Sequence, residues 1–303
     1  MTFDRAVSFD RVTKRYGETV AVDGLSFDVA RGEMFGLIGP DGAGKTTSIR
    51  LLCGLLHPDD GSIRVVNLDP VKQHRRITSQ IGYLSQRFSL YGDLSVDENI
   101  AFFAEIHGLG NYRARRDRLL DLMQLTRFRD RLADKLSGGM KQKLALACTL
   151  VHEPDVIVLD EPTTGVDPVS RREFWKLLSQ FLAGGITIVM STPYLDEAER
   201  CTRVALLDQG RLLALDSPEA LRSSLPGTLL EVITPDVRGA HRVLRDRGIA
   251  AQLFGDRLHV WSDGSDDDPA RALSALIGDS QVRTITPSLE DVYIAHLQGE
   301  HTT

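Results

Sequence analysis

One short segment, Gly39 to Thr46, constrains this chain more than any other part of it. It reads GPDGAGKT and has the pattern G-x-x-x-x-G-K-T. Glycines at these positions let successive backbone N–H groups curl around phosphate oxygens, while the lysine reaches the β and γ phosphates and the threonine hydroxyl ligates Mg²⁺. A strand-like segment precedes the pattern and a helix-forming segment follows it, so a helix N-terminus also faces the anion. The segment therefore predicts a nucleotide site in an α/β fold.

One residue of this phosphate loop is unusual, because Asp41 places an acid where an anion is expected to bind. Its carboxylate must point away from the phosphates or be offset by Mg²⁺. The residues assigned to phosphate binding are Gly39, Pro40, Asp41, Gly42, Ala43, Gly44, Lys45, Thr46 and Thr47. Thr46 is also assigned to the metal ion.

Strands and helices alternate along most of the chain, which is typical of an α/β fold with a mostly parallel sheet. The segments before the phosphate loop read as short strands. A helix-rich block from about 90 to 152 looks like an unbroken helical subdomain inserted into this alternation. Further expected elements are a helix near 45–53, strands near 62–66, 81–84, 156–160 and 186–190, and a helix near 169–182.

The pattern changes around Leu225, Pro226 and Gly227. Beyond them the expected elements follow the order β-α-β-β-α-β, with a hairpin at the GD pair, and this order is typical of a small ferredoxin-like α+β domain. We therefore expect a nucleotide-binding domain over 1–224 and an accessory domain over 226–303. The second domain is expected to sense a ligand or to support a dimer.

Composition narrows the classes of partner. The formal net charge is -6, so nucleic acid is not expected as the main partner. The three cysteines form no C-x-x-C pair and have apolar or helical neighbours, which favours a reduced cytosolic chain with buried thiols. No apolar run approaches the roughly 20 residues that span a bilayer, and no signal-peptide segment is apparent at the N-terminus. Any role at a membrane is therefore expected to act through another polypeptide.

A pair of acids ends the apolar segment 156–160. Asp160 and Glu161 are adjacent, and successive residues of a strand point to opposite sides, so the two carboxylates are expected to do different work. Asp160 suits the Mg²⁺ shell. Glu161 suits polarising the water that attacks the γ-phosphate.

A third segment, KLSGGMKQKLALACTL, places Ser137, Gly138 and Gly139 directly before an amphipathic helix. Alone, it predicts a serine N-cap and exposed glycine amides. Between the phosphate loop and the acid pair, it makes the chain resemble the nucleotide-binding subunits of ATP-binding-cassette (ABC) transporters over about residues 5 to 222. The first domain is accordingly expected to be an ABC ATPase domain of the P-loop NTPase class.

The resemblance assigns further residues. It implies that Tyr16 stacks on adenine. It also implies that Gln86 contributes to catalysis, helps to hold the Mg²⁺ ion and links the metal site to a membrane subunit. It implies that the segment GVDP at 165–168 crosses a dimer interface. Met140 stands where the family usually has glutamine. The closing segment TPSLEDVYIAHLQG is similar to the end of ATPase subunits of ABC-2-type exporters.

The resemblance also implies a mechanism. Two ATPase subunits, identical or different, would close head to tail around ATP and Mg²⁺, so that Ser137 touches ATP held by the other chain. Closure and hydrolysis would drive separate integral membrane permease subunits between two states. The chain would lie peripherally on the cytoplasmic side of the plasma membrane.

The strand near 186–190 ends in STPYLDEAE, where the family carries a histidine at the position of Pro193. That histidine contacts the γ-phosphate. Three alternatives follow: slow hydrolysis in a homodimer, a weak site paired with a more complete second ATPase, or ATP binding that mainly holds an assembly closed. Pro193 itself is expected at the first position of the next helix, where its missing N–H costs nothing.

Two other classes of protein fit the sequence less well. ABC ATPases that act in DNA repair or translation usually carry two cassettes or long coiled-coil insertions, whereas this chain has one cassette and no heptad run. A GTPase is excluded because the sequence has no N-K-x-D segment.

Overall fold

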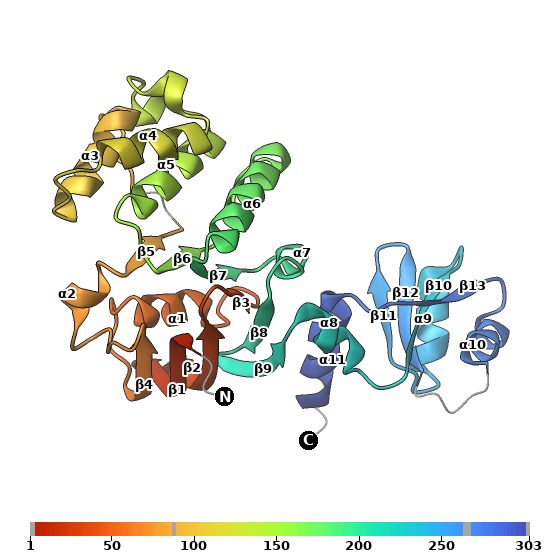
Figure 1. Ribbon diagram of the computed structural model, residues 1–303. Coiled ribbons are helices and arrows are strands. Elements are labelled where there is room, and N and C mark those ends of the chain that lie inside the picture. Colours follow the sequence, from red (N-terminus) through yellow and green to blue (C-terminus); the bar gives the residue numbers. More distant parts are fainter. Residues whose placement is uncertain (1–3, 87–88, 263–267, 301–303) are drawn as a thin grey trace. The chain divides into compact units, whose positions relative to one another are not determined.

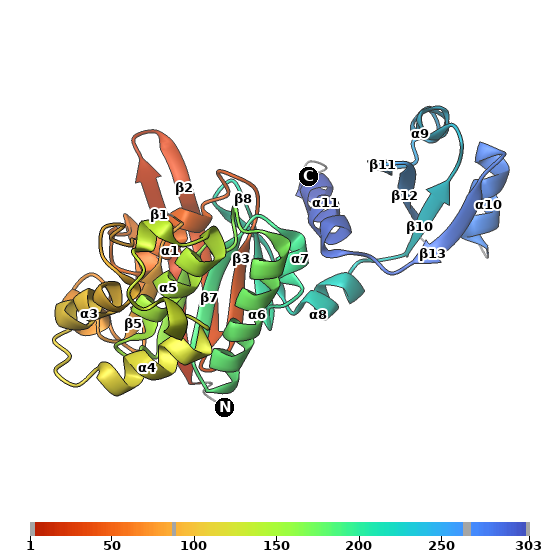
Figure 2. The same cartoon turned by 90° about the horizontal axis from the view of Figure 1, so that it is seen from above.

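The computed structural model describes residues 4–86, 89–262 and 268–300, with side chains described to residue 297. The chain divides into two compact units, Met1–Pro218 and Glu219–Thr303. Figures 1 and 2 show the elements of each unit in two views. The first unit contains the phosphate loop and the acid pair, and the second contains the expected small α+β fold.

A six-stranded sheet with the order β5-β6-β7-β3-β8-β9 forms the centre of the first unit. Its strands are parallel except for the antiparallel pair of β8 and β9. Their bounds are β3 Met34–Ile38, β5 Ile81–Leu84, β6 Val156–Asp160, β7 Thr187–Thr192, β8 Arg203–Asp208 and β9 Arg211–Asp216. Every residue of β3, β6 and β7 is buried, as strands covered on both faces require. The expected α/β fold with a mostly parallel sheet is confirmed.

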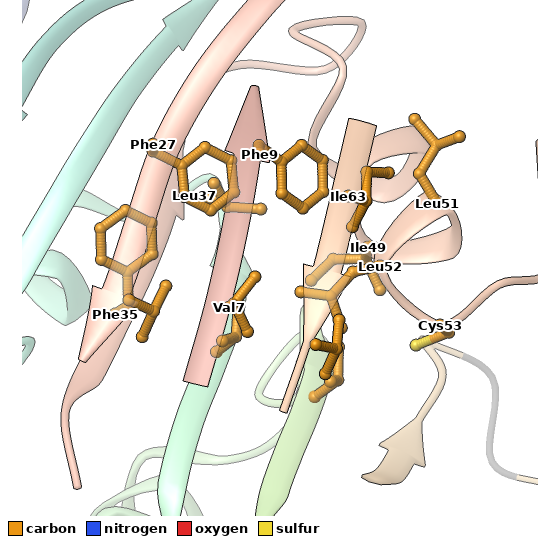
Figure 3. Close-up of a cluster of buried hydrophobic side chains, with 14 of the residues drawn as sticks. Val7, Phe9, Phe27, Phe35, Leu37, Ile49, Leu51, Leu52, Cys53 and Ile63 are labelled. Atoms are coloured by element: carbon orange, nitrogen blue, oxygen red, sulfur yellow. The ribbon is translucent and has the colours of Figure 1, made fainter. Parts of the chain in front are cut away.

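A second sheet, antiparallel with the order β2-β1-β4, was not foreseen as a separate layer. Its first two strands, β1 Arg5–Tyr16 and β2 Thr19–Ala30, are long rather than short, and their pairing contains several register shifts. Strand β4 is Asp60–Val65. Phe9, Phe27 and Phe35 stack with ring centroids 4.4 and 5.1 Å apart, so the two sheets share one core (Figure 3). Helix α1, Lys45–Leu52, packs its apolar side chains into the same cluster.

The helical subdomain lies between β5 and β6 in sequence, as expected, but it is not one unbroken helical block. It contains α3 Val96–Ile106, α4 Arg113–Leu122 and α5 Gly138–Leu150, with two short 3₁₀ turns between α4 and α5. Ser95 and Glu98 form a reciprocal capping box that begins α3. Helix α2, His74–Ile77, precedes β5, and α6 Pro168–Ala183 and α7 Leu195–Ala198 follow β6 and β7.

The second unit has the predicted β-α-β-β-α-β order. Its sheet has the order β11-β12-β10-β13, and each neighbouring pair is antiparallel, which is the ferredoxin-like arrangement. The elements are β10 Thr228–Ile233, α9 Val237–Arg245, β11 Ala251–Phe254, β12 Arg257–Ser262, α10 Pro269–Ile277 and β13 Gln281–Ile285. Leu230, Val232, Leu258 and Val260 of the sheet pack against Leu244 of α9. Helices α8, Pro218–Ser223, and α11, Leu289–Glu300, flank this fold in the sequence.

Two expectations from composition can be compared with the described residues. All three cysteines are free and buried. Burial, together with the nearby carboxylates of Glu197 and Glu33, raises the pKa of the Cys201 thiol to about 12. No helix in the described part of the chain combines the length and the apolar character that a bilayer crossing needs.

Candidate active site

The phosphate loop joins β3 to α1, and at two of its positions only glycine fits. Gly44 is the N-cap of α1 with φ 92°, and a Cβ there would overlap the carbonyl oxygen of Ala21. A Cβ at Gly39 would overlap the carbonyl oxygen of Leu207. The loop is therefore held against the backbones of β2 and β8, while the Asp41 side chain is exposed. The first N–H groups of an α-helix have no carbonyl partner within the helix, so those of α1 can donate to an anion in the loop.

Lys45 begins α1 and is only 4% exposed. Its ammonium donates to the carbonyl oxygens of Gly39, at 2.8 Å, and Pro40, at 3.0 Å. It also lies 3.5 Å from Oε1 of Glu161. A buried cation that is satisfied by loop carbonyls can redirect its donors to a phosphate when one enters. The structure thus brings the predicted lysine and the predicted catalytic acid together.

Asp160 ends β6 and is 1% exposed. Its Oδ1 accepts hydrogen bonds from Thr46 Oγ1, at 3.1 Å, and from Ser191 Oγ, at 2.6 Å. Burial, together with the nearby Asp160 carboxylate, raises the pKa of Tyr83 to about 12. A hydroxyl and a carboxylate at this distance are suitable oxygen donors for Mg²⁺, which usually takes few protein ligands and completes its shell with water and phosphate.

Glu161 follows β6 but leaves the strand conformation, with φ 47°. The strand alternation expected for the two acids therefore stops at Asp160, because the Glu161 backbone turns into the left-handed region. The two carboxylates nevertheless contact different partners. The Glu161 N–H donates to the Oγ and to the carbonyl oxygen of Ser191, both at 3.1 Å. Its carboxylate accepts from Gln86 Nε2 at 3.0 Å and from Thr164 Oγ1 at 3.4 Å. Gln86 is thus hydrogen-bonded to the predicted catalytic acid.

Ser191 and Thr164 were not among the predicted site residues. Ser191 lies near the end of β7. It contacts both acids because β6 and β7 are parallel neighbours whose carboxyl ends meet. That adjacency was the available signal. Thr164 lies three residues after Glu161 and needs the turn at Glu161 to reach it.

The prediction that Pro193 begins the next helix at its first position is wrong. Helix α7 begins at Leu195 with Tyr194 as its N-cap, so Pro193 lies in the connection from β7. Thr192 Oγ1 accepts from the Tyr194 N–H at 3.1 Å, and this bond makes the turn that delays the helix. His152, which precedes β6, is used elsewhere: its Nε2 contacts the Ile81 carbonyl oxygen and its ring stacks on His107.

The remaining predicted site residues are Tyr16 and the segment 137–139. Ser137 is the N-cap of α5 and accepts from the Met140 N–H at 3.3 Å, as predicted. A Cβ at Gly138 would meet open space, whereas one at Gly139 would overlap Ser170. Tyr16 is 48% exposed at the end of β1. Within the described part of the chain, neither Tyr16 nor the segment 137–139 is hydrogen-bonded to the phosphate loop.

The chain is similar in sequence to known proteins along nearly its whole length. The family described as ABC transporter matches residues 22–164. The chain is 38% identical to the Nod factor export ATP-binding protein I of Paraburkholderia xenovorans, over 96% of each chain. It is 39% identical to the probable multidrug ABC transporter ATP-binding protein YbhF of Escherichia coli, over 99% of this chain but 53% of YbhF. The chain thus spans about half the length of that relative.

Solved structures give the same result. A structure described as an ATP-binding subunit of an ABC transporter covers 96% of this chain and 99% of its own, at 25% identity and a TM-score of 0.68. The ATP-binding cassette MJ0796, solved as a dimer in a post-hydrolysis state bound to ADP and Pi, covers 70% of this chain and 98% of its own, at 26% identity and a TM-score of 0.62. From the phosphate loop, the paired acids and these relatives together, the chain belongs to the family of ABC transporter ATP-binding proteins.

Proposed function

We propose that this protein binds Mg²⁺–ATP and hydrolyses it as the motor subunit of an ABC-2-type export complex. The observation that carries the proposal is the position of the Glu161 carboxylate. It lies 3.0 Å from Gln86 Nε2 and 3.5 Å from Lys45 Nζ, and its backbone is bound to the same Ser191 that holds Asp160. A candidate base, a phosphate-binding cation and a metal-binding pair therefore converge.

Each of these residues has a specific task in the proposed reaction. Lys45 and the N–H groups at the start of α1 bind the phosphates, and Thr46 and Asp160 hold the metal with help from Gln86. Bound Mg²⁺ supplies charge neutralisation at the phosphate oxygens. Glu161 orients a water molecule and takes its proton as the water attacks the γ-phosphate. Most of the rate enhancement in such reactions comes from positioning and electrostatics, which a buried and hydrogen-bonded cluster provides.

The proposal includes a second ATPase subunit. Ser137, Gly138 and Gly139 would contact ATP that the other subunit holds, and the segment 165–168 would lie at the interface. Two observations support this: the amide end of α5 is not engaged by the phosphate loop in the described residues, and a structural relative has been solved as a dimer with ADP and Pi. Tyr16, exposed at the end of β1, would stack on adenine.

Export is proposed from the relatives, whose names refer to multidrug transport and Nod factor export. Integral membrane permease subunits would form the pathway, with this chain peripheral on the cytoplasmic side of the plasma membrane. Nucleic acid is not part of the proposal, in keeping with the net charge of -6. The small second unit would sense a ligand or support the dimer.

Pro193 favours one alternative, a nucleotide-gated subunit with little turnover. Proline cannot donate to the γ-phosphate, and one preorganised contact to developing charge is worth about 3 kcal/mol, or about a hundredfold in rate. We therefore expect Pro193→His to raise the steady-state rate of phosphate release by about ten- to a hundredfold. The proposed function is tested by measuring that rate for the wild type and this variant with Mg²⁺–ATP.

The outcomes of that experiment are separable. A wild type that releases phosphate slowly, with a faster Pro193→His variant, supports a hydrolytic site that lacks one contact. Equal and substantial rates would show that the contact is dispensable in this chain. Tight ATP binding with no release by either protein would reject the motor in favour of the nucleotide-gated subunit.

The division of the chain gives a second prediction. Deleting residues 226–303 is expected to leave the affinity for ATP within about twofold of the full chain, because the phosphate loop, Asp160 and Glu161 all belong to the unit Met1–Pro218. Equilibrium titration with ATP tests this, after circular dichroism has shown that the truncated protein is folded. Loss of binding in a folded truncation would overturn the proposed domain boundary.

A further inference from the structure

We propose that Glu197 is a positioning residue that fixes the backbone carrying Glu161. The inference rests on the proposed ATPase function, in which Glu161 is the base. Glu197 lies in α7, is 1% exposed and is not one of the residues that would touch nucleotide. Its carboxylate nevertheless joins the segment after Glu161 to the strand end before Pro193.

The argument begins with the backbone at Glu161. A φ of 47° is unfavourable for a residue that carries a Cβ, and such a conformation persists only where its surroundings hold it. The Glu161 side chain is contacted by Gln86, Lys45 and Thr164. All three contacts are to its carboxylate, so they do not fix the backbone from which the side chain extends. The position of the carboxylate therefore depends on what holds the backbone itself.

Three successive residues are held there by three different elements. The Glu161 N–H donates to Ser191 of β7. The Pro162 carbonyl oxygen accepts from Gln142 of α5. The Thr163 hydroxyl donates to Glu197 of α7. Of these three attachments, the one to Glu197 is the only one made by a charged group.

Glu197 is itself held in place by several partners. Its Oε2 accepts from Thr192 Oγ1 at 2.8 Å, while its Oε1 accepts from Thr163 and lies 3.7 Å from Arg171 Nε. Thr192 accepts in turn from the Tyr194 N–H, which sets the direction of its own proton. Both threonines are essentially buried, so each hydroxyl needs this partner.

Valine would fill the volume of either threonine in a core that needed only packing. Two buried hydroxyls converging on one buried carboxylate instead give a directional link between β7 and the loop after β6. Loss of the link should let residues 161–163 relax, which would move the Glu161 carboxylate. A displacement of about 1 Å at a catalytic group can cost about a hundredfold in rate.

The test uses variants that change the link with little change of shape. Thr163→Val removes the hydroxyl, and Thr163→Ser keeps it. Glu197→Gln can keep an acceptor toward Thr192 and present an amide donor to the Thr163 hydroxyl, while it removes the charge opposite Arg171. Glu197→Ala removes the whole link. Asp196→Asn is the matched control, because Asp196 is the exposed neighbouring acid, 3.5 Å from the same arginine.

We expect kcat to fall about ten- to a hundredfold in Thr163→Val and Glu197→Ala, with the Kd for ATP within about twofold of wild type. Thr163→Ser and Glu197→Gln should retain most of the activity, since both preserve hydrogen bonding. Asp196→Asn should match the wild type. If Glu197 served only to balance Arg171, Glu197→Gln would be as damaging as Glu197→Ala, and the inference would be wrong.

A second readout does not depend on activity. The Thr164 and Val166 N–H groups donate to the carbonyl oxygens of Glu161 and Thr163, so their hydrogen exchange reports on the loop. Exchange in nucleotide-free Thr163→Val should be faster than in Thr163→Ser. If the wild type turns over and Thr163→Val has the same kcat and the same hydrogen exchange as the wild type, the proposed role of Glu197 is overturned and the proposed ATPase function stands. Absence of wild-type turnover would reject the proposed function, and unchanged exchange would then also reject the link.

Discussion

Replacing Glu161 by glutamine is expected to lower the steady-state rate of ATP hydrolysis by about 10²–10⁴-fold, the usual contribution of a positioned general base. The amide has the same size as the carboxylate and can still contact Gln86 and Thr164, so the site should keep its shape. It cannot take a proton from water. Affinity for ATP should remain close to that of the wild type, because Lys45 and the phosphate loop are unchanged.

The control for this variant is Glu153→Gln, since Glu153 pairs with Arg115 on the surface and lies outside the proposed site. It should hydrolyse ATP at the wild-type rate. Glu161→Gln can also be compared with the wild type for export in cells. If export survives in the variant, the nucleotide-gated subunit becomes the better description. If hydrolysis survives as well, the proton acceptor is a different group.

Replacing Lys45 by alanine is expected to weaken ATP binding about ten- to a hundredfold. A hydrogen bond to a charged group contributes about 1.5–3 kcal/mol, and each 1.4 kcal/mol is a factor of ten in Kd. Lys45 is buried and lies where the phosphates are expected, so water cannot replace its ammonium fully. The measurement is the Kd for ATP by equilibrium titration.

Lys72→Ala provides the matched control, because the Lys72 side chain is 82% exposed and pairs only with Asp69 in the described residues. Its affinity for ATP should equal that of the wild type. Lys45→Ala also removes the donor to the carbonyl oxygens of Gly39 and Pro40, so its folding needs a separate check by thermal unfolding. A folded Lys45→Ala protein that binds ATP normally would place the phosphates elsewhere.

Much of the fold was predictable because its signals are local. The phosphate loop needs glycine where a Cβ would overlap a neighbouring backbone, and Ser137 caps α5 through a residue three positions away. Apolar runs such as Val156–Asp160 are buried on both faces and read as strands without further information. The ferredoxin-like order in the second unit followed from the sequence of its elements.

The incorrect or missed details depend on contacts between distant segments. The turn at Glu161 is held by Ser191, thirty positions away in the sequence, and no local pattern predicts a positive φ for a glutamate. The delayed start of α7 depends on the Thr192 hydroxyl, which competes for the Tyr194 N–H. The separate antiparallel sheet depends on β4 pairing with β1 across the whole phosphate-loop region.

The most direct test of the account is the rate at which purified wild-type protein releases phosphate from Mg²⁺–ATP, measured beside Glu161→Gln over a range of protein concentrations. We predict release by the wild type that exceeds that of Glu161→Gln by at least about a hundredfold. The rate per chain should also rise with protein concentration, because each site is completed by a second subunit. Equal rates for the two proteins at every concentration, with ATP bound by both, would contradict the claim that this chain hydrolyses ATP through Glu161.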